Sequence, residues 1–150
     1  MKQFNKDNFI EFLLLNADYT LEEATEHVKS ARIVTYKDTH LVNYPNGIID
    51  IVKDGLFGHY RVLTLEEKIN LTLSLADGFL YPETYPHTGK VMWKVNSFWT
   101  NYRKDKIVLN PVDEGFEKSL NLAIWVLIER REQYYADCEM EVQQTCRYTF

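Results

Sequence analysis

The chain has 150 residues, of which 45% are hydrophobic and 26% are charged. This length matches one ordinary domain with a sizeable buried core, so the chain needs no disulfide framework to hold it together. The net charge of -5 excludes a protein that coats nucleic acid over its whole surface, but it is compatible with a local basic face. We therefore expect one globular domain over residues 1–150, with a tail at residues 143–150 that can fray.

The termini and the cysteines favour a cytoplasmic protein. The first residues carry charged and polar side chains where a secretory signal would have its apolar core, and the apolar run at residues 12–15 is too short to span a bilayer. The two cysteines, Cys138 and Cys146, fit neither a disulfide framework nor a zinc-binding pattern. We expect reduced thiols and no membrane association.

Two short helices open the chain. The first is predicted over residues 5–15, and its inward positions are Phe9, Ile10, Leu13 and Leu14. The second begins at a capping box, Thr20-Leu21-Glu22-Glu23, and extends to about residue 30. Because only a few residues separate the two helices, we expect an antiparallel helical hairpin.

An antiparallel meander follows the helices. Residues 33–36, 41–44 and 48–52 are rich in β-branched and aromatic side chains, and turn residues at 45–47 and 53–55 separate or follow them. Residues 56–63 predict one more strand, interrupted at Gly58.

The next segments alternate between helix, loop and strand. A second capping box at Thr64 opens a helix whose expected inward face is Leu65, Ile69, Leu73 and Ala76. Residues 79–90 contain two prolines and a glycine, so we interpret them as an ordered loop. Two strands are then predicted at residues 91–99 and 106–109.

A helix over residues 110–131 is the element around which the chain is organised. Asn110 can cap it, Pro111 suits the first helical position, and Asp113 places a carboxylate near the positive end of the helix dipole. Helical spacing gives the helix two apolar faces. One comprises Phe116, Leu120, Ala123 and Leu127, and the other comprises Leu122, Trp125 and Val126. We therefore expect a buried helix covered on both sides.

The order of the elements predicts an α+β fold. It consists of an antiparallel or mixed sheet of about five to six strands, an N-terminal helical hairpin and a long buried C-terminal helix. This layout is similar to that of small phage and prophage accessory proteins, in arrangement and composition and without a shared motif. The similarity implies an accessory or inhibitory protein of a mobile element.

The sequence contains no motif that specifies catalysis. It lacks the Gly-x-Ser-x-Gly, Walker-type and Gly-x-Gly-x-x-Gly patterns, and its four histidines lack the helical spacing of metal ligands, so we expect no metal and no cofactor. An enzyme site would have to be built from His59, which lies beside Gly58, or from His87 with a carboxylate such as Glu83.

Charge is distributed unevenly along the chain. Residues 1–27 carry two lysines and six carboxylates, whereas residues 87–112 carry five basic residues and one carboxylate. The basic stretch also carries four aromatic rings. Its candidate binding residues are Lys90, Trp93, Lys94, Phe98, Trp99, Tyr102, Arg103, Lys104 and Lys106. Cations beside aromatic rings are typical of protein interfaces and of proteins that bind single-stranded nucleic acid, but alternate rings could instead face the core.

Our leading hypothesis is a non-enzymatic protein that acts through contacts with a protein partner and can form a homodimer. The first alternative is a nucleic-acid-binding protein that uses residues 90–106, and the second is a small enzyme with a site around His59 or His87.

Overall fold

The computed structural model describes residues 4–96, 107–111 and 115–148, and the side chains of the last helix as far as Glu139. The chain forms two compact units, Met1–Leu65 and Glu66–Phe150. The fold is α+β, as predicted. However, the described strands form two antiparallel sheets, of four and three strands, instead of one sheet. Each described strand pairs with its neighbours along the chain, so each unit has a sheet of its own.

Two helices open the first unit at the predicted places, α1 (Lys6–Asn16) and α2 (Leu21–Ser30). The Thr20 hydroxyl accepts the Glu23 N–H at 3.2 Å and donates to the Glu23 carboxylate at 3.0 Å, so the predicted capping interaction is present. The buried positions of α1 differ from the prediction, because Phe12 is buried whereas Leu14 is 39% exposed. Phe12 stacks on Phe9 at 5.4 Å and brings more apolar surface into the core than Leu14 would.

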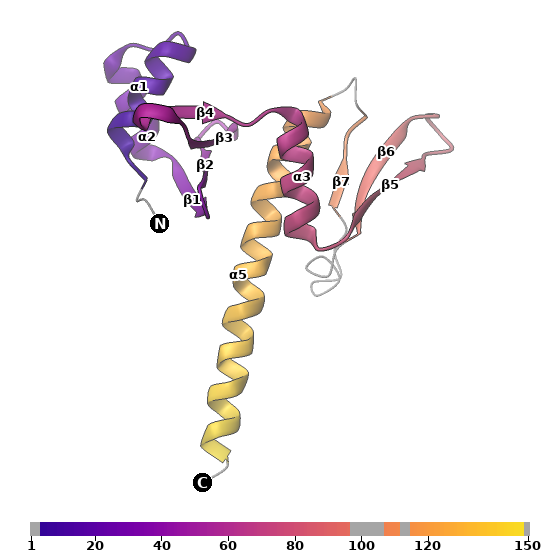
Figure 1. Ribbon diagram of the computed structural model, residues 1–150. Helices are drawn as coiled ribbons and strands as arrows, with labels where there is room; N and C mark the ends of the chain where they lie inside the picture. The colour runs from indigo at the N-terminus through magenta and orange to yellow at the C-terminus, as the bar shows by residue number, and fades with distance from the viewer. Residues whose placement is uncertain (1–3, 97–106, 112–114, 149–150) are drawn as a thin grey trace. The chain divides into compact units, whose positions relative to one another are not determined.

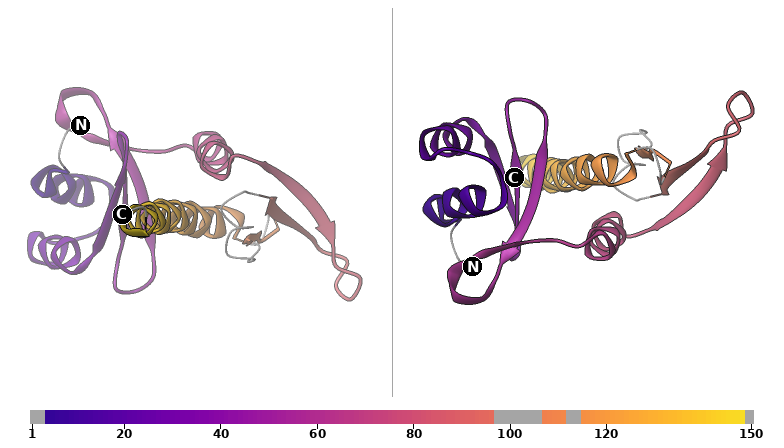
Figure 2. Two further views of the ribbon diagram at one scale, coloured as in Figure 1. Left: turned by 90° about the horizontal axis from the view of Figure 1, so that it is seen from below. Right: turned by 90° about the horizontal axis from the view of Figure 1, so that it is seen from above.

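The predicted meander is present as β1 (Arg32–Tyr36), β2 (Thr39–Asn43), β3 (Ile49–Asp54) and β4 (Tyr60–Val62), in that order across the sheet. Helices α1 and α2 lie together on one face of this sheet (Figure 2). Their shared core comprises Phe9, Phe12, Leu13, Ala24, Val28, Val42, Tyr44, Val52 and Tyr60.

The strand predicted over residues 56–63 is only partly a strand. A short 3-10 turn, η1 (Leu56–Gly58), precedes β4. Phe57 and Gly58 have φ values of 59° and 77°, in the left-handed region that a β-strand cannot use. The chain therefore turns at these residues and enters the sheet only at Tyr60.

The second unit contains α3 (Leu65–Ala76, whose first residue closes the first unit), β5 (Phe79–Thr84), β6 (Val91–Asn96), β7 (Ile107–Leu109) and α5 (Phe116–Tyr148) (Figure 1).

The prediction of a loop was wrong for residues 79–84, which pair with β6 as β5. The N–H of Tyr85 donates to the carbonyl of Lys90 at 3.0 Å. Along an antiparallel ladder, every second residue directs its backbone N–H to the neighbouring strand. Tyr85 is at such a position. Pro82 lies three residues earlier, so its nitrogen points away from β6, to the unpaired edge of β5. A proline is compatible with an edge strand in this position.

The buried face of α3 also differs from the prediction. Its buried residues are Lys68, Thr72, Leu75 and Ala76, whereas Leu65 is 41% exposed. The Lys68 ammonium lies 3.0 Å from the Glu117 carboxylate on α5, and this partner allows a cation to be buried. A prediction from hydrophobic spacing assumes that lysine lies at the surface, so it assigned the wrong buried face to α3.

The long helix α5 begins at Phe116, not near Asn110 as predicted. Gly115 has a φ of 85°, outside the helical region, and the Asn110 N–H donates to the Ser119 hydroxyl at 3.0 Å. Trp125 is 4% exposed, which confirms its predicted burial, but Leu122 is 54% exposed, so the second apolar face is not fully covered. Beyond Ile128, no side chain as far as Glu139 is buried. Among the helices described, none is long and apolar enough to cross a membrane.

Candidate functional site

One face of the β5–β6–β7 sheet carries three aromatic side chains, of which Phe79 is exposed and Tyr81 and Tyr85 are half-buried. The strand register places Lys94 between Tyr81 and Val108, with Phe79 and Glu83 as the neighbours of Tyr81 on the same face. Val95 and Leu109 lie on the opposite face and are buried. We call the side that carries Lys94 the outer face and define it by Phe79, Tyr81, Glu83, Met92, Lys94 and Val108, with Tyr85 continuing the alternation just beyond the strand.

The outer face is apolar at its edges and polar at its centre. Phe79 is 55% exposed and Val108 is 38% exposed, and the ring of Phe79 lies 6.0 Å from that of Tyr81. The Lys94 ammonium lies 2.6 Å from a Glu83 carboxylate oxygen and 5.9 Å from the centre of the Tyr85 ring. The hydrogen bond to Glu83 raises the pKa of Lys94. Lys94 is therefore held as a cation, and its charge is balanced within the face.

The β5–β6 hairpin extends beyond β7. Strand β7 pairs only with Trp93, Lys94 and Val95, so the far ends of β5 and β6 form a two-stranded ribbon. A turn at residues 85–90 closes the ribbon, with the Gly89 N–H donating to the Tyr85 carbonyl at 2.8 Å. The far end of the ribbon is exposed from Pro86 to Val91.

The structure describes three of the predicted binding residues. Lys90 is exposed at the end of the ribbon, and Trp93 lies half-buried on the face opposite Lys94. The other six lie outside the described residues: Phe98, Trp99, Tyr102, Arg103, Lys104 and Lys106. The rings that accompany Lys94 come instead from β5 and the residue after it, in a segment predicted to be a loop. The signal was present as the period-two alternation of Phe79, Tyr81, Glu83 and Tyr85.

The two histidines considered for an enzyme site are both on the surface. His59 Nδ1 lies 3.6 Å from a Glu11 carboxylate oxygen, with side chains that are 58% and 50% exposed. His87 is exposed in the hairpin turn, and Glu83, its suggested carboxylate partner, pairs with Lys94. Over the residues that the structure describes, His, Cys, Asp and Glu side chains form no group of three that could hold a metal ion.

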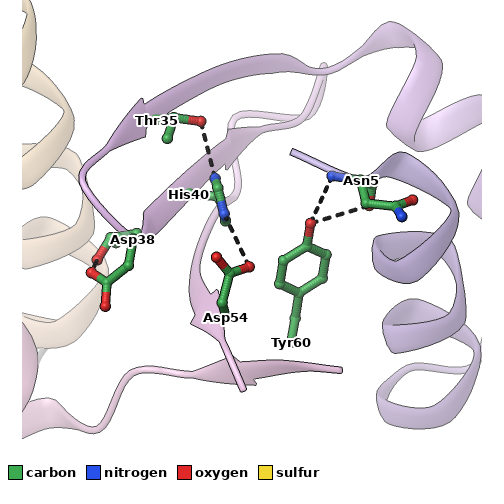
Figure 3. A network of polar contacts seen from close by, with 7 residues as sticks. Asn5, Thr35, Asp38, His40, Asp54 and Tyr60 are labelled. Carbon is green, nitrogen blue, oxygen red and sulfur yellow. Dashed lines mark hydrogen bonds and ion pairs between the residues drawn. The ribbon is translucent and has the colours of Figure 1, made fainter. Parts of the chain in front are cut away.

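A buried histidine that no sequence motif indicates, His40, lies in the first unit (Figure 3). The Thr35 hydroxyl lies 3.0 Å from His40 Nδ1, and an Asp54 carboxylate oxygen lies 3.4 Å from His40 Nε2, within ion-pair range but without hydrogen-bond geometry. The order of hydroxyl, imidazole and carboxylate is that of a hydrolase triad. However, the ring is 0% exposed and packs against Phe4 and Tyr60, with centroids 5.1 and 5.5 Å away.

The strand register explains why these three residues meet. Thr35 is the cross-strand partner of His40, and Asp54 lies two residues from Val52, the partner of His40 on β3. Side chains at such opposite and diagonal positions share a face of the sheet and come within reach of each other. His40 therefore links β1, β2 and β3 from a position that a substrate could not reach, and we assign it a structural role.

Comparisons of this chain with protein-family models, with curated proteins and with solved structures found no match. Its function therefore has to follow from the chemistry of its own surfaces.

Proposed function

We propose that this chain is a non-enzymatic binding protein that contacts a protein partner through the outer face of the β5–β6–β7 sheet. The observation that carries the proposal is the pairing of Lys94 with Glu83 at 2.6 Å within a face on which Phe79 and Val108 are exposed and the tyrosines are half-buried. This pairing favours a protein partner over nucleic acid, the two binding hypotheses that the sequence left open.

Binding to nucleic acid depends on cations that are free to neutralise phosphates. The charge of Lys94 is already balanced by Glu83, so transfer of Lys94 to a phosphate would leave the Glu83 carboxylate facing the nucleic acid. A protein partner requires no such exchange. The outer face would present it with tyrosine, phenylalanine and methionine side chains, which are enriched in protein interfaces.

Phe79 is the expected anchor of this interface. It is 55% exposed and lies beside Tyr81, so its ring has apolar surface to lose to a partner while its backbone is held in the sheet. A rigid aromatic anchor of this kind commonly contributes about 2 kcal/mol or more to binding, which corresponds to roughly a thirtyfold change in affinity.

The experiment starts with photo-crosslinking from position 79 in cells of the source organism, and mass spectrometry of the crosslinked product. The identified partner is then purified, and its affinity for the parent chain and for variants is measured by calorimetry. We expect Phe79→Ala to weaken binding by roughly thirtyfold and Val108→Ser to weaken it by a smaller factor.

The matched control is Val91→Ser. Val91 is 41% exposed and Val108 is 38% exposed, but Val91 lies on the opposite face of the sheet. Equal losses for Val91→Ser and Val108→Ser would overturn the assignment to the outer face. Binding of a single-stranded oligonucleotide that weakens steeply with salt, and that Phe79→Ala abolishes, would overturn the protein partner in favour of nucleic acid.

A further inference from the structure

The first unit has an open pocket between α1 and α2. Its volume is about 380 Å³. The residues that line it are Asp7, Ile10, Glu11, Leu14, Leu21 and Thr25. All six belong to the first unit, so this pocket is independent of the outer face of the β5–β6–β7 sheet.

The floor of the pocket is apolar although it is open to solvent. Ile10 and Leu14 lie one turn apart on α1, and Leu14 is 39% exposed. Leu21, on the first turn of α2, is 63% exposed. Thr25 follows one turn later, and its hydroxyl donates to the Leu21 carbonyl at 2.7 Å. The polar group of Thr25 is thus satisfied within its own helix, and the pocket favours an apolar occupant.

The rim of the pocket is acidic. Asp7 and Glu11 lie one turn apart on α1, next to the row formed by Ile10 and Leu14. Residues 6–30, which span both helices, carry six carboxylates and two lysines. Glu11 lies 3.6 Å from His59 Nδ1 but remains 50% exposed, so a lysine or arginine of a partner can approach it. An occupant should therefore combine apolar side chains with positive charge.

We propose that this pocket binds a basic amphipathic helix of a partner protein. Apolar side chains of that helix would enter between Leu14 and Leu21, and lysine or arginine side chains one turn apart would pair with Asp7 and Glu11. A helix places residues three and four positions apart on one face, and this matches the one-turn spacing of both rows in the pocket. The carboxylates repel nucleic acid and anionic lipid, which would otherwise compete for an exposed apolar surface.

The test uses a synthetic peptide of about 18 residues, long enough to form a helix, with leucines along one face and lysines flanking them. A second peptide has glutamate at every lysine position. Binding to the whole chain is measured by fluorescence anisotropy at low and high salt. We expect the lysine peptide to bind with an affinity that falls as salt rises, and the glutamate peptide not to bind.

The matched variants are Leu21→Ser and Leu15→Ser. Leu15 is 73% exposed but does not line the pocket, so we expect only Leu21→Ser to weaken binding, by about tenfold. Glu11→Gln should reduce the salt dependence, whereas Glu22→Gln, outside the pocket, should change it less. Circular dichroism verifies that each variant is folded.

Three results would overturn the proposal. The first is failure of the lysine peptide to bind, and the second is equal effects of Leu21→Ser and Leu15→Ser. The third is a dimer of the parent chain that Leu21→Ser dissociates, because the occupant would then be a second copy of this chain. Val108→Ser should leave peptide binding unchanged, and this keeps the test separate from that of the outer face.

Discussion

The Tyr60 hydroxyl accepts the backbone N–H of Asn5 at 2.8 Å and donates to the Asn5 carbonyl at 3.2 Å. Asn5 caps α1, because its side chain accepts the N–H groups of Asp7 and Asn8. Tyr60 begins β4. One phenol therefore fixes the start of the first helix to the edge of the first sheet, across 55 residues of chain.

Removal of that hydroxyl should destabilise the first unit. Tyr60→Phe leaves the Asn5 N–H without this partner and removes one of two hydrogen bonds to the Asn5 carbonyl, which also accepts the Phe9 N–H at 3.2 Å. We expect a loss of about 1 to 3 kcal/mol in the free energy of unfolding. Urea denaturation measures the change. The control is Tyr19→Phe, which retains the ring that packs 4.8 Å from His27. Equal stability of Tyr60→Phe and the parent would contradict this role of the hydroxyl.

Tyr44 should make the protein sensitive to alkali. Burial raises the pKa of Tyr44 far above its ordinary value of 10.0, and the Asp50 carboxylate, which accepts its hydrogen bond at 2.7 Å, raises it further. Above pH 10 the unfolded chain releases this proton while the folded protein keeps it, so stability falls as pH rises. We expect the parent to lose about 1.4 kcal/mol more per pH unit than Tyr44→Phe. Parallel curves of stability against pH for the two proteins would show that Tyr44 is not responsible.

Gly55 should not tolerate a side chain. A Cβ atom added there would lie 2.5 Å from the His59 carbonyl oxygen, the group that accepts the Gly55 N–H at 2.8 Å. We expect Gly55→Ala to cost about 1 to 3 kcal/mol in thermal or chemical denaturation, because the turn backbone has to shift. Phe57→Ala in the same turn should change stability by less than about 0.5 kcal/mol, because Phe57 is 95% exposed. A reversed order of these two costs would contradict the described turn.

Two positions on α5 should differ sharply in their contribution to stability. Trp125 is 4% exposed, and Trp125→Ala should cost about 3 to 5 kcal/mol through lost burial and a cavity. Leu122 is 54% exposed, and Leu122→Ala should cost less than about 1 kcal/mol. Denaturation monitored by circular dichroism compares the two variants. Similar costs would mean that both faces of the helix are covered, as the sequence had indicated.

Cys138 and Cys146 should remain unbonded to each other. Both lie on α5, and eight residues of helix separate their Cα atoms by about 12 Å, beyond the roughly 7 Å that a disulfide can span. Alkylation without reductant, followed by mass measurement, should add two labels per chain. An unlabelled chain two hydrogen masses lighter would require the helix to be broken between these residues.

The sequence predicted those parts of the fold that depend on neighbouring residues. The capping interaction of Thr20 with Glu23, the helical hairpin and the meander all depend on local signals, and all are present. The face of α3 was misplaced because burial of Lys68 depends on Glu117, a residue far along the chain. The division into two sheets also depends on which strands pair, and hydrophobic alternation does not encode that choice.

The candidate site was predicted only in part, because its surface is shared between strands. Lys94 was identified from composition, but its aromatic neighbours come from β5, where Pro82 suggested a loop. Local propensity does not reveal that a proline nitrogen can point away from a ladder. The pocket between α1 and α2 was missed because the sequence placed Leu14 in the core, whereas Leu14 is 39% exposed and lines the pocket beside Ile10, which packs against the core.

The proline in β5 also limits how copies of this chain can assemble. A strand from another molecule that aligned with the outer edge of β5 would find no N–H at Pro82 with which to continue the hydrogen-bonded ladder. Edge-to-edge pairing of β5–β6 hairpins from different molecules, which is the strand arrangement of cross-β fibrils, is therefore interrupted at Pro82. The hairpin can therefore expose aromatic side chains to a crowded solution while its edge resists polymerisation.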